Sequence, residues 1–293
     1  MRTLPAAGLL GAVLVSFSAL APGWPERSAP HTQRAGSLLE AEGTDQAMWT
    51  GARDAAKQVR AGQGVRREDG KGVSVAAASP GDRTCPVGSA YLPAGTFVMG
   101  DRGDEVSVAE LCLDLTEVTV EAYSDCYYQG ECSAALTGSD CNSGVSGRRN
   151  HPINCVDWNQ ADTYCRAQGK RLPTEEEWEW AARSGPEGRS YPWGSEEPGA
   201  QVCWDGAGND EGRLKRTSTC AVGVHPEGDS AQGVHDLAGN VWEWTSGKQW
   251  AAQVFRGGCW SLTVGEPMRA AYRGWGDSSY RFFFLGFRCA RSP

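Results

Sequence analysis

The sequence lacks several features that mark common classes of protein. Its main apolar run, Ala6 to Leu20, is too short for a comfortable membrane span. Lysine and arginine do not cluster and the formal net charge is −8, which argues against a surface for nucleic acid or anionic membranes. No stretch of about 20–50 residues repeats, which disfavours a solenoid or a propeller.

Common catalytic signatures are missing as well. The four histidines are scattered and form no HExxH motif or helical pair, so we do not expect a zinc or non-haem iron site. There is no GxSxG elbow, P-loop or EF-hand. The chain is instead rich in cysteine, glycine and tryptophan, with 11, 38 and 12 residues respectively.

The N-terminal part of the chain predicts export. The run Ala6 to Leu20 has the length of a signal-peptide core, and Ala19-Leu20-Ala21 offers a cleavage site, so residues 1–21 predict a signal peptide. An uncleaved anchor is the alternative, because Pro22 directly follows that site. Residues 22–84 have no sustained apolar period and predict a flexible linker. We expect a secreted, periplasmic or cell-surface protein with no membrane span in the mature chain.

The remaining residues, 85–293, predict one domain with few regular elements. Residues 91–100 predict a short strand, and the apolar alternation from Leu111 to Val120 within 111–127 predicts a half-buried strand. The stretch from 129 to 150 predicts a loop. Two pairs with capping-box spacing predict two short helices within 157–183: Asp157 with Gln160, and Thr174 with Glu177.

Six segments of this domain resemble the motifs of one family. They are GTFVMG (95–100), NCVDWNQADTYCRAQGKRLPTEEEWEWAAR (154–183), YPWG (191–194), GNVWEW (239–244), RGGCW (256–260) and GFRC (286–289). The domain thereby resembles the sulfatase-modifying-factor, or formylglycine-generating enzyme, family. The resemblance implies an α+β, C-type-lectin-like fold that is loop-rich, with little regular secondary structure. It also implies a disulfide between Cys165 and Cys289.

The other cysteines also predict disulfides, because an exported chain with many thiols usually oxidises them. Eleven is an odd number, so at least one cysteine is unpaired or pairs with another chain. Proximity in sequence suggests four further pairs and leaves Cys259 as the odd thiol, although spacing alone does not fix connectivity. The suggested pairs are Cys85–Cys112, Cys126–Cys132, Cys141–Cys155 and Cys203–Cys220.

The catalytic pattern of the family is interrupted in this chain. Formylglycine-generating enzymes carry two cysteines that hold copper(I), a soft ion suited to thiolates. The corresponding positions here are Leu262 and Pro267, so we do not expect copper. Cys259 replaces the serine of the family's GGS corner. It is a candidate reactive thiol, and the alternative is a small buried apolar residue.

The segment 262–284 predicts a binding surface. Arginine and aromatic side chains are enriched in recognition surfaces because they offer large contact area with few rotamers to fix. Some C-type-lectin-like relatives of the family present this segment to their ligands. The alternative is rigid packing beneath a loop. The candidate binding residues are Arg269, Tyr272, Arg273, Trp275, Tyr280 and Arg281.

The segment HDLAGNVWEW (235–244) resembles a calcium loop of the family, and calcium prefers carboxylate and carbonyl oxygens. By position, the ligands would be the side chains of Asp236 and Glu243 and the carbonyls of Gly239 and Val241. The alternative is that Glu243 pairs with a core arginine such as Arg288, while the two neighbouring tryptophans pack and no metal binds.

These observations predict an exported, non-catalytic binding or accessory module for an unknown protein or a small-molecule or glycan ligand, with calcium as its cofactor. One alternative is a formylglycine-generating oxidase that acts on a sulfatase cysteine through an atypical thiol site. Another is unrelated chemistry on the same scaffold, because a fold alone does not define a reaction.

Overall fold

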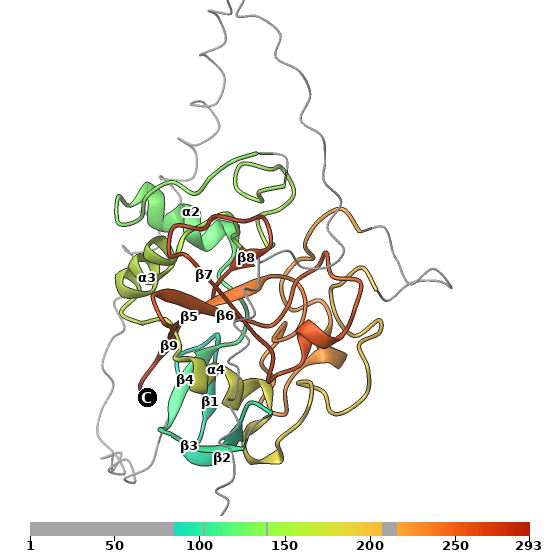
Figure 1. Ribbon diagram of the computed structural model, residues 1–293. Helices are drawn as coiled ribbons and strands as arrows, with labels where there is room; N and C mark the ends of the chain where they lie inside the picture. The colour runs from blue at the N-terminus through green and yellow to red at the C-terminus, as the bar shows by residue number, and fades with distance from the viewer. Residues whose placement is uncertain (1–84, 102, 139, 207–215) are drawn as a thin grey trace, which may run out of the picture. The chain divides into compact units, whose positions relative to one another are not determined.

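The computed structural model describes residues 85–101, 103–138, 140–206 and 216–293 (Figure 1). The expected signal peptide, 1–21, and the expected linker, 22–84, lie outside the described residues. Among the residues described, no helix has the length and apolarity needed to cross a membrane.

Short strands and three α-helices form the described part of the domain. The helices are α2 (Val120–Tyr128), α3 (Trp158–Ala167) and α4 (Glu175–Ala182). Of three 3₁₀ turns, η1 (Gly185–Glu187) and η2 (Pro226–Gly228) lie between α4 and β5, and η3 (Glu266–Met268) lies between β6 and β7. The strands are β1 (Ser89–Leu92), β2 (Gly95–Met99), β3 (Asp104–Val108), β4 (Leu111–Asp114), β5 (Trp242–Gln249), β6 (Ala252–Arg256), β7 (Arg273–Gly276), β8 (Leu285–Gly286) and β9 (Ala290–Arg291).

The strands form three small sheets. The first has the order β1-β4-β9, so the C-terminal strand pairs antiparallel with a strand near the start of the domain. The second is the hairpin β2-β3. The third has the order β7-β6-β5-β8, antiparallel except for the parallel pair β5 and β8. In Figure 1, α4 lies between the β2-β3 hairpin and the sheet formed by β5 and β6, and it contacts both.

Both predicted capping boxes are present. Asp157 accepts the Gln160 amide at the start of α3, and the Gln160 side chain accepts the Asp157 amide in return. Thr174 and Glu177 make the same reciprocal pair at the start of α4. Each box satisfies backbone donors that a helix start leaves free, which is why both predicted helices form where the spacing places them.

The strand predicted across 111–127 is correct only in its first part. β4 ends at Asp114, and α2 begins at Val120 because the Thr119 side chain accepts the Ala122 amide as an N-cap. The apolar alternation that continued to Val120 therefore spans a turn. β4 is also buried on both faces, because Leu111, Cys112 and Leu113 are all covered although neighbouring side chains of a strand point to opposite faces.

Five disulfides fasten these elements. They are the five pairings expected from the sequence and the resemblance: Cys85–Cys112, Cys126–Cys132, Cys141–Cys155, Cys165–Cys289 and Cys203–Cys220. Cys259 is the one free cysteine, and it is buried. The bond between Cys165 and Cys289 joins α3 to the segment just before β9, so it ties the middle of the domain to its C-terminal end.

Candidate functional site

The edge strand β7 carries the most exposed part of the predicted binding segment. Trp275 lies on this strand and is 48% exposed. Side chains alternate between the two faces of a strand, so the side chain of Trp275 leaves β7 on the face opposite Gly274 and Gly276. A Cβ atom on Gly274 would lie 2.1 Å from the Phe255 ring, and one on Gly276 would lie 2.6 Å from the Tyr280 ring. The two glycines thus let aromatic rings cover one face of β7 while Trp275 projects from the other.

Exposed aromatic rings flank β7 on both faces. On the Trp275 side lies Trp250 from the turn between β5 and β6, which is 82% exposed, with its ring centroid 6.2 Å from that of Trp275. On the other side Tyr280 packs against Phe282, with 5.0 Å between centroids, and both rings are partly exposed. We call these four residues, together with the unpaired side of β7, the aromatic edge.

Tyr272 is exposed as well, but its ring contacts the buried Trp242, with 6.0 Å between centroids. Its ring therefore packs against the core at the start of β7, and we do not count it in the aromatic edge. Trp250 was missed from the sequence, and Phe282 lies in the predicted binding segment, 262–284, but is not among its candidate binding residues. A tryptophan in a short turn between two strands was the available signal for Trp250.

The three candidate arginines are all engaged in ion pairs. Each guanidinium reaches a carboxylate from another element, so these side chains bind the late segment to the rest of the domain. Their positive charges are already matched within the chain. The pairs are Arg269 with Asp101, Arg273 with Glu175, and Arg281 with Asp157.

The predicted thiol site holds a single, buried sulfur. Cys259 has no exposed surface, and burial raises the pKa of its thiol to about 11, so it is neutral at physiological pH. All eleven cysteines lie within the described residues, and the other ten form disulfides. Leu262 and Pro267 border the glycine corner beside Cys259, close to where a Cβ atom on Gly258 would stand. The oxidised protein thus has no second thiolate with which to hold copper(I).

The expected calcium loop is tightly folded but fits the metal only in part. Asp236 and Asn240 adopt positive φ values of 55° and 52°, and the Gly239 amide donates to Gly257. Asp236 is buried and accepts the Gly223 amide at 2.6 Å. Its carboxylate suits a calcium ligand. The carbonyls of Gly239 and Val241 belong to the same turn and stay predicted ligands.

Glu243 does not fit the expected ligand set. Both of its carboxylate oxygens accept from the Arg288 guanidinium at 2.7 Å, and one also accepts from the indole of Trp178 at 2.9 Å. The alternative expected from the sequence, an ion pair with Arg288 between packed tryptophans, is therefore what the structure contains. Burial alone would lower the pKa of Arg288, but the ion pair with Glu243 raises it above its ordinary value.

Sequence reasoning missed Glu117, a third acid beside this loop. Glu117 is 1% exposed and precedes α2. Burial, followed by the charge of Asp236, raises the pKa of Glu117 well above its ordinary value. An acidic residue inside the apolar segment LTEVTV could have indicated a buried carboxylate, but the sequence does not show which side chains that carboxylate contacts.

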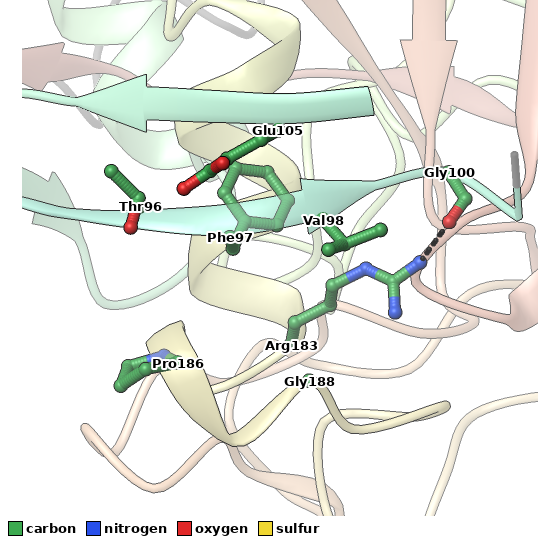
Figure 2. A pocket seen from close by; sticks show the side chains of 8 residues that line it. All are labelled: Thr96, Phe97, Val98, Gly100, Glu105, Arg183, Pro186 and Gly188. Carbon is green, nitrogen blue, oxygen red and sulfur yellow. Dashed lines mark hydrogen bonds between the residues drawn. The ribbon is translucent and has the colours of Figure 1, made fainter. Parts of the chain in front are cut away.

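A separate cleft of about 380 Å³ lies between the β2-β3 hairpin and the end of α4. Figure 2 shows Arg183 reaching to the carbonyl of Gly100, at 3.0 Å, beneath a wall that includes Phe97 and Glu105. A second nitrogen of Arg183 donates to Glu179 at 2.6 Å. The lining of this cleft contains no cysteine or histidine.

The one group of three possible metal-ligating side chains among the described residues is Cys203, Cys220 and His225. The first two form a disulfide, so their sulfurs are not thiolates. In the oxidised protein this group is not a metal site.

Short antiparallel sheets, long irregular connections and a C-terminal strand that returns to the first sheet define an α+β domain of the C-type-lectin-like class. Among solved structures, Treponema denticola variable protein 1 is similar with a TM-score of 0.55 at 20% identity, over 70% of this chain and 95% of that one. A likeness at this identity bears on the fold alone.

Within this class the family is also defined. Residues 76–293 match the sulfatase-modifying factor enzyme 1-like domain, and the chain belongs to that family. The inactive C-alpha-formylglycine-generating enzyme 2 of Bos taurus is 37% identical over an alignment of 166 residues that covers 50% of this chain and 52% of that protein. The formylglycine-generating enzyme of Streptomyces coelicolor is 37% identical over 180 residues, covering 50% and 55% respectively. The chain thus spans about half the length of these relatives.

Proposed function

We propose that this domain is a non-catalytic binding module that recognises an extended polypeptide at the aromatic edge. The observation that carries the proposal is the edge strand β7, whose outer side pairs with no described strand, with exposed aromatic side chains on both of its faces. An edge strand offers free backbone N–H and C=O groups to an added strand. The flanking rings would contact side chains that alternate along such a strand.

The charges around the edge favour a segment without net charge. Arg273, the first residue of β7, and Arg281, which follows the strand, are each paired with a carboxylate of the domain. An acidic ligand would find no unmatched arginine there, and a charged group in the interface would lose water without gaining a partner. Aromatic side chains supply the contact area instead.

A lack of oxidase activity follows from the state of the cysteines. The family's copper site needs two thiolates, whereas Cys259 is a single buried thiol and the remaining cysteines are oxidised. Similarity to the relative named inactive C-alpha-formylglycine-generating enzyme 2 supports the same proposal.

We further propose that the chain is exported through residues 1–21, because five disulfides suit an oxidising compartment.

Replacing both tryptophans of the edge tests the binding site. We expect wild-type protein to select neutral, β-prone sequences from a displayed random-peptide library, and Trp250→Ala/Trp275→Ala to weaken binding of the selected peptides at least ten-fold, because these are the most exposed rings flanking β7. Affinities are measured by surface plasmon resonance. Tyr128→Ala is the matched control, since Tyr128 is 70% exposed on α2 and lies outside the edge.

Two results would refute the proposal. Equal peptide binding by the double variant and wild type would show that the aromatic edge does not bind the peptide. Binding of wild type to a glycan array in place of peptides would assign a sugar ligand.

A separate assay tests the proposed lack of oxidase activity. Disulfide-intact protein is incubated with copper and a CxPxR peptide, and formation of an aldehyde would show that the domain is an enzyme.

A further inference from the structure

The cleft between the β2-β3 hairpin and the end of α4 has the size of a small-molecule site. Its volume is about 380 Å³, within the range of about 300–1,000 Å³ that such sites occupy. Its lining includes the apolar side chains of Val98 and Pro186 and the charged side chains of Glu105 and Arg183 (Figure 2). We call it the hairpin cleft. None of its lining residues belongs to the aromatic edge, so a function of this cleft is separate from peptide binding.

Arg183 has one nitrogen that is free for a ligand. The residue is the C-cap of α4 and is 9% exposed. Its Nε donates to Glu179 at 2.6 Å, and its Nη2 donates to the carbonyl of Gly100 at 3.0 Å. Its third nitrogen, Nη1, donates to none of the residues that the structure describes, and Figure 2 shows it directed away from Gly100. Because both N–H groups of Nη1 are donors, they remain available to an anion in the cleft.

The positive charge of Arg183 has no acid of its own. Glu179, its ion-pair partner, also pairs with Arg256 at 2.7 Å. Arg256 in turn contacts Glu175, which is matched by Arg273. Three arginines thus share two acids, and one positive charge is in excess, which is costly in a largely buried group. The acids next in sequence to Gly100 and Pro186 are already paired, Asp101 with Arg269 and Glu187 with Arg189.

Glu105 is an unmatched acid of the same cleft. It lies on β3 opposite Val98 of β2, so both side chains project from the same face of the hairpin. Glu105 is exposed, and its side chain has no hydrogen-bond or ion-pair partner among the described residues. It forms no ion pair with Arg183, although both line the cleft. The hairpin cleft therefore presents one positive and one negative group that do not match each other.

This arrangement selects for a ligand that carries both charges. A purely anionic ligand would be attracted by Arg183 and repelled by Glu105, and a purely cationic one would meet the reverse. We propose that the hairpin cleft binds a small zwitterion of the amino-acid class, with its carboxylate on Arg183 and its ammonium group on Glu105. Guanidinium and carboxylate groups form strong, charge-assisted hydrogen bonds. Val98 and Pro186 offer apolar contact to an aliphatic side chain of such a ligand.

Leucine and two of its derivatives test the proposal on the full chain. L-leucine carries both charges, N-acetyl-L-leucine lacks the ammonium group, and L-leucine amide lacks the carboxylate. We expect leucine to bind, and each derivative to bind at least about ten-fold more weakly, because each loses one charged contact. Isothermal titration calorimetry measures the affinities. No detectable binding of leucine, or equal binding of the three compounds, would overturn the proposal.

A variant of Glu105 tests its contact with the ammonium group. Glu105 is exposed, so Glu105→Gln should fold as wild type does, and it should bind leucine and N-acetyl-leucine with similar affinity. Glu131→Gln is the matched control, because Glu131 is an exposed acid outside the cleft, and it should keep the wild-type preference for leucine. An unchanged preference in Glu105→Gln would overturn the role of Glu105.

A variant of Arg183 tests the contact with the carboxylate. Arg183→Met should abolish leucine binding, and wild-type affinity in the folded variant would overturn the role of Arg183. Because the change also removes a partner of the buried Glu179, its melting temperature is measured in parallel. If the variant does not fold, the comparison of leucine with its amide on wild type decides the same point. Trp250→Ala/Trp275→Ala should bind leucine as wild type does, so failure of this proposal and failure of peptide binding are distinguishable.

Discussion

At the scale of single residues, burial decides what Cys259 can do. A reactive cysteine needs an exposed thiolate in an electropositive setting. Cys259 has no exposed surface, and its thiol contacts the Ser261 hydroxyl at 3.4 Å. The residue behaves as a small apolar side chain beside the glycine corner, which was the alternative to a reactive thiol in the sequence.

We therefore expect native protein to resist alkylation by iodoacetamide at pH 8. Burial raises the pKa of Cys259 to about 11, so the thiol stays neutral at all lower pH values and is shielded from the reagent as well. Mass spectrometry should find no label on native protein and one label per chain after unfolding in guanidinium without reductant. Rapid labelling of the native protein would restore Cys259 as a candidate functional thiol.

At the scale of elements, α4 shows how a helix of acids comes to be buried. Its sequence EEEWEWAA places Glu175, Glu177 and Glu179 inside the domain, at 4%, 8% and 0% exposure. Each of these acids has an arginine partner. Arg256 contacts both Glu175 and Glu179, and Arg171 donates two hydrogen bonds to Glu177. Buried charges persist only when paired in this way.

The first turn of α4 offers a quantitative test. Thr174→Ala removes the side-chain oxygen that accepts the Glu177 amide at 3.2 Å, and we expect a loss of about 1 kcal/mol in the free energy of unfolding. Thr174→Ser keeps the acceptor and should recover most of the loss. Urea denaturation followed by tryptophan fluorescence measures both variants. Equal stability of all three proteins would show that this cap is redundant.

At the scale of the whole molecule, the longest disulfide loop closes the domain. Cys165 and Cys289 are 124 residues apart, whereas Cys126 and Cys132 are separated by 6. A cross-link that restricts a longer loop lowers the entropy of the unfolded chain more. The two bonds should therefore contribute unequally to stability.

We expect Cys165→Ala/Cys289→Ala to lose about 5 kcal/mol of unfolding free energy, and Cys126→Ala/Cys132→Ala to lose about 2 kcal/mol. Guanidinium denaturation measures both, with the short-loop variant serving as the control for loss of a buried disulfide. A larger loss from the short loop would show that local packing outweighs chain entropy here.

The sequence alone determined the family and the two capped helices, because these depend on local spacing and on motifs that stay contiguous. The five cysteine pairings in the structure are those suggested beforehand, four by proximity in sequence and Cys165–Cys289 by the resemblance, although spacing alone did not fix them. Reciprocal capping at Asp157 and Thr174 needs only neighbours three residues away. The strand prediction was wrong beyond Asp114, because the N-cap at Thr119 competes with an apolar alternation that continues past it.

Only the tertiary structure decided how the charged and aromatic side chains are used. It assigned Glu243 to Arg288, 45 residues away, and left Glu117 beside Asp236. It also pairs the candidate arginines with carboxylates of the same domain and places Trp250 beside Trp275 at the edge of a sheet. The energy of a charge or an exposed ring depends on its neighbours in space, and no local pattern in the chain states which these are.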